Sequence, residues 1–530
     1  MSENTVKIHI TGSGSELQGV GRLSDGRAVF VPGALPGEDV EIEITELKDR
    51  FAKGALKKVL TPSTDRVTPD CPYYGSCGGC AARHMNYDCA LRLKREKVYN
   101  ALTRIGGLKD PVVEDTLPSP LVSSYRNKAE FARDNGRVGV FEEGSHSVID
   151  VDSCLLQDKK ANALLGYLKA NIGKLPVRYI VTRVNSAGEV MLTLSLSYPT
   201  DISDLAKAVT EQFDFVKSVY ACRLSLRPAH ALDGPCTLVT GKETLTETLC
   251  GLTFSVSPRS FFQVNRLQAE RLYDTAISMA GLTGTENVCD IYCGAGTISL
   301  CAAKDAAHVT GIEIVPDAIR DAKENAKHNH LPNTTFLCGD AAKLYPALSK
   351  KTPFDTVITD PPRAGMDKAV VDALLANPPK RIVYVSCDPG TLARDIKRLT
   401  ADGTFRMEKA VPADMFPGTY HCETVCSLVL RNAPVHIDID VDVEELLQSK
   451  RGQATYTQIK QYVMEHTGLN VPNLYISQIK RKYGLDVGES YNKPKSDNPR
   501  VPQCPPEKEA AIEEAMKFFG IIDIPSSNSH

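Results

Sequence analysis

The 530-residue chain is 42% hydrophobic, which is enough apolar side chain for three or four domains of about 150 residues each. Its formal net charge of −3 excludes a uniformly basic protein, so any nucleic-acid surface must be a local patch of lysine and arginine. No apolar run reaches the length of a membrane span, and MSENTVKIHI lacks the regions of a signal peptide, so we expect a cytoplasmic protein without a membrane partner.

Residues 1–62 contain short strands with turns at SDG and PGED: VKIHI, then GVGRLSDGRAVFVPGALPGEDVEIEIT, then KGALKKVL. This pattern predicts a small β-barrel, with a simple β meander as the alternative. The segment GVGR…DGRAVFVPGALPGE resembles the TRAM domain, an OB-like barrel of RNA-modifying enzymes, and the resemblance implies contact with RNA. Charge for that contact, or for a solvated basic face, comes from Arg22, Arg27, Lys48, Arg50, Lys53, Lys57 and Lys58.

Residues 63–250 are predicted to form a central α+β domain. It begins with the cysteine-rich CPYYGSCGGCAARH, and the helical spacing of apolar residues then predicts a helix over 87–106 that ends at two glycines. Strands and shorter helices alternate over 120–250, and we expect 178–197 to be a hairpin that turns at AGE.

The sixteen cysteines, without a secretory signal, indicate thiols and metal ligands rather than a disulfide scaffold. Cys71, Cys77 and Cys80 are spaced C-x5-C-x2-C among glycines, which let the backbone wrap around a centre. Cys154 is the best fourth ligand, because Cys89 falls in the predicted helix and is expected to be a buried structural cysteine. Four cysteines hold either a [4Fe–4S] cluster or a structural zinc, and the wide x5 spacing favours the cluster.

Residues 251–432 are predicted to form a Rossmann-like α/β domain. NVCDIYCGAGT (287–297), FDTVITDPPRAG (354–365) and IVYVSCD (382–388) each run from a buried strand into a turn, and open parallel sheets bind ligands at such strand ends. Glu313 and Asp340 end two further strands, where they can meet a ribose and an adenine amino group. Two acids beside a glycine turn without a clean G-x-G-x-x-G suit S-adenosylmethionine better than the alternative, NAD.

Cys387 is the candidate nucleophile. A thiol and a base beside a methyl donor suit methyl transfer to C5 of a uracil. That carbon becomes reactive when a thiolate adds to C6, and a base must then remove the C5 proton. Ionising an unperturbed thiol at pH 7 costs roughly 2 kcal/mol, which a polar strand end can lower. Glu423 is the candidate base, because it enters the apolar run TVCSLVL, where an acid is costly unless it is used or paired. His421 would share its face in a positioning role.

Six ordered motifs resemble the RNA uracil-5-methyltransferase family: SPRSFFQVN (257–265), DIYCGAGT (290–297), GIE (311–313), DPPRAG (360–365), SCDPGTLARD (386–395) and DMFPGTYHCE (414–423). The resemblance covers about residues 5–431. With the TRAM segment and the cysteines, the chain is most similar to the 23S rRNA branch of RumA-like enzymes.

The resemblance implies formation of 5-methyluridine in RNA, most directly 23S rRNA, through a covalent adduct of Cys387 with uracil C6 and proton abstraction by Glu423. It also implies that S-adenosylmethionine is bound by Gln263, Tyr292, Glu313 and Asp360, with Asp360 also able to orient the uracil. The implied ligands of the [4Fe–4S] cluster are Cys71, Cys77, Cys80 and Cys154. Arg126 and Lys128 of YRNKAEF (125–131) match too, either toward phosphates or as a solvated strand.

Three alternatives remain at this stage: a tRNA uracil-5-methyltransferase, an exocyclic-amine methyltransferase and a non-catalytic iron–sulfur RNA-binding protein. The arginine of DPPR, in place of an aromatic residue, and the pair Cys387 and Glu423 oppose the second. The third leaves a nucleophile, a base and a cofactor site unexplained. No obligate protein partner is indicated.

A polar-acidic stretch over 433–445 predicts a domain boundary, and residues 446–530 form a small helical extension outside the family pattern. TYTQIKQYVMEHTGL (455–469) and NLYISQIKRKYGL (473–485) predict two helices, the second bearing Lys480, Arg481 and Lys482. A docking domain with a basic exposed face is favoured over a helix-turn-helix contact with nucleic acid. The final IPSSNSH is expected to fray.

Overall fold

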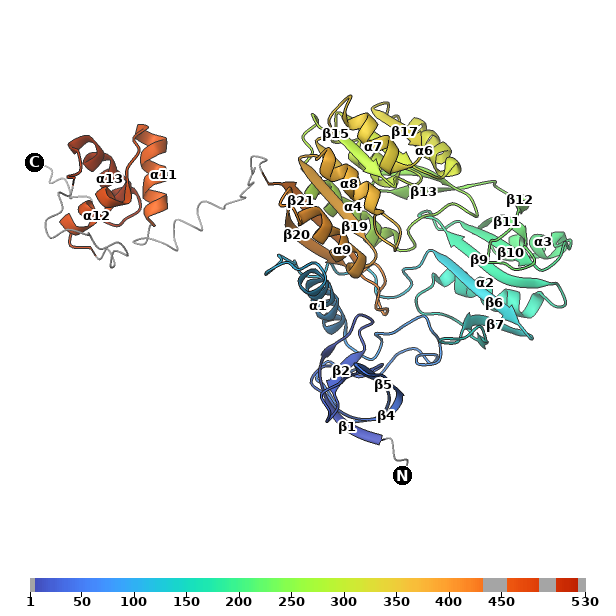
Figure 1. Ribbon diagram of the computed structural model, residues 1–530. Coiled ribbons are helices and arrows are strands. Elements are labelled where there is room, and N and C mark those ends of the chain that lie inside the picture. Colours follow the sequence, from blue (N-terminus) through green and yellow to red (C-terminus); the bar gives the residue numbers. More distant parts are fainter. Residues whose placement is uncertain (1–4, 432–454, 486–501, 523–530) are drawn as a thin grey trace, which may run out of the picture. The chain divides into compact units, whose positions relative to one another are not determined.

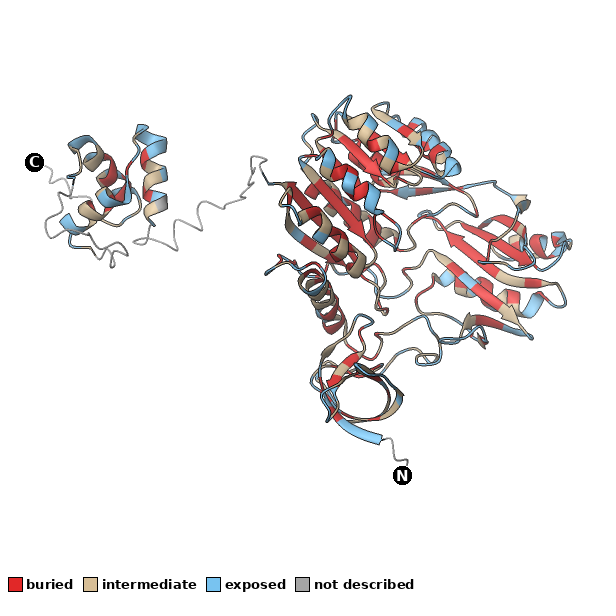
Figure 2. Ribbon diagram, viewed as in Figure 1, coloured by how far each residue is buried: buried red, intermediate tan, exposed pale blue. Residues whose placement is uncertain are grey.

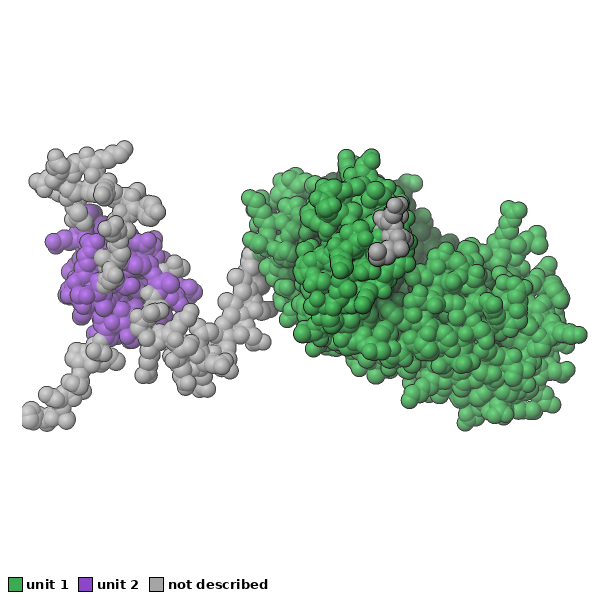
Figure 3. Space-filling model, turned by 90° about the horizontal axis from the view of Figure 1, so that it is seen from below, with its two compact units in different colours: residues 1–433 green, residues 434–530 purple. Residues whose placement is uncertain are grey.

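A computed structural model describes residues 5–431, 455–485 and 502–522 (Figure 1). The chain divides into two compact units, residues 1–433 and 434–530, which Figure 3 colours separately. The predicted boundary at 433–445 and the predicted fraying of IPSSNSH both lie outside the described residues.

The first five strands close into a barrel in the order β1-β2-β3-β5-β4, which confirms the predicted β-barrel (Figure 1). Alternate side chains point inward, and Ile10, Val29, Val31, Val40 and Ile42 form its fully buried core. The strands are β1 (Thr5–Ser13), β2 (Gly19–Arg22), β3 (Ala28–Val31), β4 (Asp39–Leu47) and β5 (Phe51–Thr61).

The predicted helix after the cysteine-rich segment is α1 (Tyr87–Arg104). Asn86 caps it, because its side chain accepts a hydrogen bond from the backbone N–H of Cys89 at 2.8 Å. Cys89 itself is buried, as expected. Helix α1 packs against α9 (Pro389–Thr400), the helix that follows Cys387. A segment that precedes the central sheet in the chain therefore lies beside the candidate nucleophile.

The central sheet has seven strands in the order β12-β11-β10-β9-β6-β7-β8. Antiparallel pairing of β9 with β10 confirms the predicted hairpin at 178–197. The sheet's core includes Phe131, Leu164, Ile180 and Leu192. Its elements are β6 (Lys128–Asp134), β7 (Arg137–Phe141), β8 (Val148–Asp150), α2 (Lys159–Asn171), β9 (Val177–Val184), β10 (Val190–Leu196), α3 (Ser203–Gln212), β11 (Val216–Arg223) and β12 (Cys236–Gly241).

A second seven-stranded sheet has the order β17-β16-β15-β18-β19-β21-β20, with β21 antiparallel to β19. The hairpin of β13 (Leu245–Leu249) and β14 (Leu252–Val256) precedes it. Its elements are α4 (Arg266–Ala280), β15 (Asn287–Ile291), α5 (Thr297–Ala302), β16 (His308–Glu313), α6 (Pro316–His328), β17 (Thr334–Cys338), α7 (Ala341–Ser349), β18 (Thr356–Thr359), α8 (Lys368–Ala376), β19 (Arg381–Ser386), α9, β20 (Phe405–Ala413) and β21 (Glu423–Leu430).

Both faces of this sheet are covered, which confirms the predicted α/β domain. Val383 packs into one core with residues of α4, α5 and α6, and its neighbour Tyr384 packs into a second core with α1, α8 and α9. The strands therefore have buried residues on both faces (Figure 2). From β15 the chain goes to β16 on one side and later to β18 on the other, so a topological switch point lies between β15 and β18.

The C-terminal unit contains α11 (Tyr456–Thr467), α12 (Asn473–Lys482) and α13 (Pro506–Phe518) in its described residues. The first two are the predicted helices, and Ile459, Ile476 and Ile512 contribute to its core. Lys482 Nζ pairs with two acids of α13, at 2.6 Å from Glu509 and 2.8 Å from Glu513, so part of the basic turn faces its own unit. The boundaries at 62/63 and 250/251 stay predictions. None of the helices in the described ranges is long and apolar enough to cross a membrane.

Candidate active site

The candidate nucleophile and base meet at one edge of the second sheet. Cys387 follows β19, and Glu423 begins the antiparallel neighbour β21. Ser386 pairs with Thr424 in the register of these strands, so the next position on each strand is Cys387 and Glu423. Asp360 directly follows β18, which is parallel to β19. The topology thus brings together three side chains that were predicted from separate motifs.

These three groups share one electrostatic environment. Burial, followed by the carboxylates of Glu423 and Asp360, raises the pKa of Cys387 to about 11. Burial raises the pKa of Glu423 to about 8, and Asp360 adds to this rise. The pKa of Asp360 is raised to about 7, again by burial. A proton is therefore readily held at this strand edge near neutral pH.

Arg363 is the cation that opposes these shifts, because it lowers the pKa of both Cys387 and Glu423. Its loop is tied to α9: Thr391 Oγ1 donates to the Arg363 carbonyl at 3.2 Å, and Arg394 Nη2 donates to the Ala364 carbonyl at 2.8 Å. In the sequence, this arginine stands out only as a departure from an aromatic motif. Its position three residues after Asp360, in the turn that follows the strand, was the signal for a role.

Cys387 lines a cavity of about 770 Å³. The other walls come from α1, which contributes Lys97, and from the barrel, which contributes Arg22 and Phe30. Such a volume lies in the range of pockets that hold a small organic ligand, about 300–1,000 Å³. The cavity is therefore large enough for a small organic group beside the thiol, and the barrel forms part of its wall.

His421 also lines this cavity, which agrees with its predicted proximity to the site. Its ring lies 4.3 Å from the Tyr420 ring and 5.9 Å from the Phe416 ring, measured between centroids. Burial lowers its pKa to about 4, so the imidazole is neutral at pH 7. A neutral ring packed between aromatic residues suits a positioning role.

The glycine turn after β15 is braced by Glu313 from the end of β16. Gly294 donates its N–H to Glu313 Oε2 at 3.2 Å, and the amides of Ile314 and Val315 donate to Oε1. Tyr292 has φ of +67°, an uncommon left-handed conformation for a non-glycine residue. The chain thus turns sharply between β15 and α5, as the motif predicted.

Asp290, which the sequence analysis missed, lies at the same strand end. Its side chain is buried, Ser299 Oγ donates to its Oδ2 at 2.5 Å, and its Oδ1 has no partner among the described residues. Burial raises its pKa to about 7, and the nearby carboxylates of Asp360 and Glu313 contribute. The signal was an acid inside the apolar NVCDI. These carboxyl groups fit a cationic ligand, and S-adenosylmethionine carries an ammonium and a sulfonium group.

The other predicted cofactor residues lie around this turn. The buried Tyr273 hydroxyl of α4 interacts with the side chains of Gln263 and Asp360, so these two predicted residues lie near one tyrosine. Asp340 caps α7 by accepting a hydrogen bond from the Ala342 N–H at 3.0 Å. The predicted adenine contact therefore already has a structural task.

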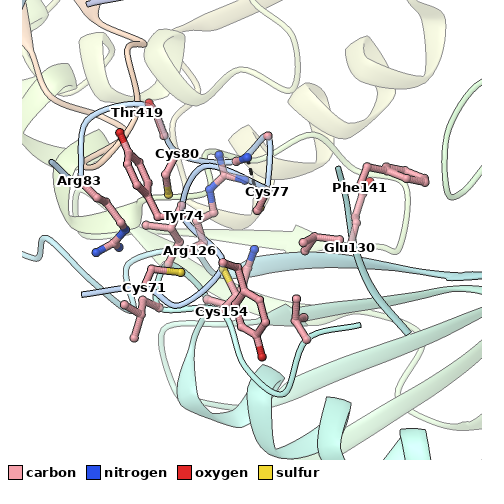
Figure 4. Close-up of a pocket in the computed structure, with 18 of the residues that line it drawn as sticks. Cys71, Tyr74, Cys77, Cys80, Arg83, Arg126, Glu130, Phe141, Cys154 and Thr419 are labelled. Carbon is pink, nitrogen blue, oxygen red and sulfur yellow. Dashed lines mark hydrogen bonds between the residues drawn. The ribbon is translucent and has the colours of Figure 1, made fainter. Parts of the chain in front are cut away.

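Cys71, Cys77, Cys80 and Cys154 all line a second cavity, of about 690 Å³ (Figure 4). Burial raises the pKa of Cys77 and of Cys80, and the neighbouring thiols add to both shifts. Arg83 faces the Cys80 thiol and opposes its shift. Across the described ranges, however, no three His, Cys, Asp or Glu side chains are arranged to hold a metal ion. The predicted cluster is therefore not shown by the structure.

The two cavities share one wall, because His421 lines both. Arg126 and Lys128, the predicted phosphate contacts, line the cysteine cavity instead of the cavity of Cys387. The Arg126 guanidinium lies 5.7 Å from the centroid of the Phe416 ring, in the loop that leads to Glu423. These two cations therefore lie beside the thiols.

Two family models match the chain. The model described as tRNA (Uracil-5-)-methyltransferase matches residues 86–432, and the TRAM domain model matches residues 3–57. An uncharacterized RNA methyltransferase of Caldanaerobacter subterraneus is 41% identical over 444 residues, which is 79% of this chain and 96% of that protein. One from Clostridium tetani is 38% identical over 443 residues, 80% of this chain and 95% of that protein.

A solved structure is also similar. The Pyrococcus abyssi tRNA (uracil-54, C5)-methyltransferase, in complex with S-adenosyl-L-homocysteine, has 29% sequence identity and a TM-score of 0.66. The match covers 80% of this chain and 100% of that one. These matches confirm the resemblance noted in the sequence and the TRAM identity of the barrel. The chain belongs to the tRNA (uracil-5-)-methyltransferase family, whose members are S-adenosylmethionine-dependent RNA methyltransferases.

Proposed function

We propose that this protein methylates C5 of a uracil in 23S rRNA and forms 5-methyluridine. The observation that carries the proposal is the meeting of Cys387, Glu423 and Asp360 at one strand edge, with Cys387 in a cavity that the barrel also lines. A nucleophile, a base and an RNA-facing wall are the three parts that this reaction requires.

In the proposed mechanism, Cys387 Sγ forms a bond to uracil C6, and the electron pair moves to give a nucleophilic C5. When bound, S-adenosylmethionine supplies the methyl group that C5 takes. Glu423 then accepts the C5 proton, and elimination breaks the bond between sulfur and C6, which restores the thiolate. A Glu423 pKa of about 8 suits a base that must hold and release this proton near neutral pH.

Arg363 and Asp360 support the same steps. Arg363 favours the ionised form of Cys387, which is the form that attacks. Asp360 lies beside both reacting groups, and we propose that it orients the uracil ring. For the cofactor, we propose contacts with Gln263, Tyr292, Glu313 and Asp360, to which Asp290 adds a buried carboxyl group for a cationic ligand.

We propose that Cys71, Cys77, Cys80 and Cys154 hold a [4Fe–4S] cluster. A zinc ion requires four thiolates within about 2.3 Å of one point. A cluster spreads its four ligands over several iron atoms, which suits four thiols around one larger cavity. Buried N–H groups of Arg83 and Arg126 without a well-placed acceptor in the described structure fit an anionic centre. When bound, the cluster would supply a cross-link between residues 71–80 and Cys154.

Metal analysis tests the cluster proposal directly. Protein purified without oxygen is expected to be brown and to contain iron and acid-labile sulfide. Stoichiometric zinc without iron or sulfide would contradict the cluster and would leave the methyl-transfer proposal untouched.

The proposed domain layout places RNA against residues 1–62, with 63–250 as the cysteine-bearing domain, 251–432 as the methyltransferase domain and 446–530 as an extension. Arg22 and Phe30 of the barrel support RNA contact because they line the cavity of Cys387. We propose a cytoplasmic enzyme, since its substrate is RNA.

A tRNA substrate is the second candidate, because the similar Pyrococcus abyssi enzyme is named for uracil 54 of tRNA. The ground for placing 23S rRNA first is the resemblance of the barrel segment and the cysteines, in the sequence, to the 23S rRNA branch. Mapping the 5-methyluridines lost from a deletion strain separates the two: loss from 23S rRNA alone supports the first, and loss from tRNA alone overturns it.

The reaction itself is tested with RNA tritiated at uracil C5. Tritium is expected to be released only when S-adenosylmethionine is present, in a ratio of one tritium per methyl group. Methylation with full retention of tritium would refute the mechanism.

A further inference from the structure

Cys250 and Cys301 have no part in the proposed mechanism. Cys301 belongs to one apolar core of the second sheet, Cys250 packs against that core, and the two thiols interact with each other. Cys250 and Gly251 form the two-residue turn between β13 and β14, because Leu249 pairs with Leu252. Both turn residues have positive φ, +52° for Cys250 and +71° for Gly251. Such turns favour Asn, Asp or Gly, so the cysteine occupies a strained position that its backbone does not explain.

Neighbouring groups hold Cys250 in this position from two sides. Its N–H donates to Glu270 Oε1 of α4 at 3.3 Å, and its carbonyl accepts a hydrogen bond from Lys304 Nζ, just after α5. Cys250 is half-buried, whereas Cys301 is buried in α5. A small oxidant can therefore reach Cys250, and its only near thiol partner among the described cysteines is Cys301.

Cys301 is connected to the cofactor site through α5. It lies four residues after Thr297, which is one helical turn, so both residues are on one face of α5. Thr297 faces Tyr273, and Tyr273 faces Gln263 and Asp360, two of the proposed cofactor residues. A displacement of Cys301 therefore shifts the helix that begins directly after the glycine turn.

We propose that Cys250 and Cys301 form a reversible disulfide under a peroxide oxidant, and that this bond weakens cofactor binding. Cys250 attacks hydrogen peroxide to give a sulfenic acid and one water. The Cys301 thiol then displaces the sulfenic oxygen as a second water and forms the S–S bond, so two electrons pass to the peroxide. A low-molecular-weight thiol reverses the reaction by disulfide exchange.

The effect on binding follows from bond length. A disulfide requires the sulfur atoms to approach to about 2.05 Å, closer than two unbonded thiols can lie. Because Cys250 lies in a tight two-residue turn and Glu270 of α4 holds its N–H, we expect α5 to adjust toward the hairpin. We expect S-adenosylhomocysteine to bind about tenfold more weakly to the oxidised protein, within the usual range of coupling between sites. The inference rests on the proposed cofactor site.

The chain offers a matched control in Cys222 and Cys236. These residues are directly opposite each other in the antiparallel pair β11 and β12, and their thiols also interact directly. Residues at such positions have Cα atoms about 4.5–5.5 Å apart, which also suits a disulfide. Both lie in the central sheet, whereas the glycine turn after β15 belongs to the second sheet. Oxidation there is expected to leave cofactor affinity unchanged.

The test uses the full-length, cluster-loaded protein, treated with hydrogen peroxide or kept reduced. Mass spectrometry of peptides prepared without reduction is expected to find Cys250 linked to Cys301. Calorimetry is expected to show the tenfold loss of S-adenosylhomocysteine affinity, reversed by dithiothreitol. In Cys301→Ser the peroxide-dependent loss should disappear, whereas in Cys236→Ser it should remain.

Three results would overturn this inference and leave the proposed cofactor site standing. They are no link between Cys250 and Cys301 at complete thiol oxidation, a link without a change in S-adenosylhomocysteine affinity, and an equal loss of affinity in Cys301→Ser. Absence of S-adenosylhomocysteine binding to the reduced protein would overturn the proposed cofactor site, and this inference with it.

Discussion

Lys94 Nζ donates a hydrogen bond to Asp414 Oδ1 at 2.5 Å, although 320 residues separate the two in the chain. Both side chains are buried. Lys94 also donates to the Phe416 carbonyl at 3.3 Å, and Lys97 of the same helix donates to the Tyr420 carbonyl at 3.0 Å. Helix α1 therefore fixes the loop that leads into Glu423 and sets where the proposed base enters the site.

Removing one partner of this pair should destabilise the protein strongly. Lys94→Met leaves the Asp414 carboxylate buried without its cation, which typically costs about 3–5 kcal/mol. Chemical denaturation of the full-length protein should measure this loss as a lower free energy of unfolding of residues 1–433. The double variant Lys94→Met with Asp414→Leu should recover most of it, because no unpaired charge remains.

The exposed pair of Lys368 and Asp372 provides the control, since their side chains are 74% and 55% accessible. Lys368→Met is expected to change the free energy of unfolding by less than about 1 kcal/mol. Equal losses in Lys94→Met and Lys368→Met would show that the buried pair has no special role.

Variants of the proposed nucleophile and of the proposed base should block methyl transfer at different steps. Cys387→Ala cannot form the bond to C6, so neither product nor a covalent complex with RNA is expected. Glu423→Gln can form the adduct and accept the methyl group but cannot remove the proton, so a complex should accumulate on denaturing gels while turnover falls about 10²–10⁴-fold. A Cys387→Ala enzyme with normal turnover would remove the nucleophile assignment.

Activity should rise with pH. The ionised forms of Glu423 and Cys387 are the reactive ones, and their pKa values in the free protein are about 8 and about 11. We therefore expect kcat/KM to increase between pH 6.5 and 8.5. In Arg363→Gln the rise should move to higher pH, because Arg363 lowers both pKa values, whereas Arg363→Lys should move it less. A pH-independent kcat/KM in the wild type would contradict this account.

Asp290→Asn should stabilise the protein at alkaline pH and weaken cofactor binding. The Asp290 pKa of about 7 lies above its ordinary value of 3.8, so the folded protein binds more protons than the unfolded chain between these values. The contribution of Asp290 to stability is thus full below pH 3.8 and is lost as pH rises through 7. The slope is at most about 1.4 kcal/mol per pH unit. The neutral variant should therefore have the higher melting temperature at pH 8.

The same variant should bind S-adenosylhomocysteine more weakly, because the ligand's ammonium group loses a buried carboxylate. A charged hydrogen bond contributes about 1.5–3 kcal/mol, so we expect about a 10- to 100-fold loss by calorimetry. Unchanged affinity together with unchanged stability would show that Asp290 is not part of the site.

Local patterns predicted the elements that carry the site. Alternating apolar residues and glycine turns predicted the barrel, the spacing of apolar residues predicted α1, and apolar runs ending in polar residues predicted the strand ends at Asp360 and Cys387. These features depend on neighbouring residues, so one sequence is enough to infer them. Asp290 was missed because its acid lies inside such a run and was taken as part of the glycine motif.

The sequence by itself determined which strand ends carry a thiol, acids and a glycine turn, because those depend on residues adjacent in the chain. Only the tertiary structure decided which of them meet. The register of β19 with β21 brings Cys387 next to Glu423, and Arg363 faces both. Helix α1 holds the loop before Glu423 through Lys94 and Asp414, which are 320 residues apart in the chain. The raised pKa values follow from burial, and burial exists only once distant segments pack together.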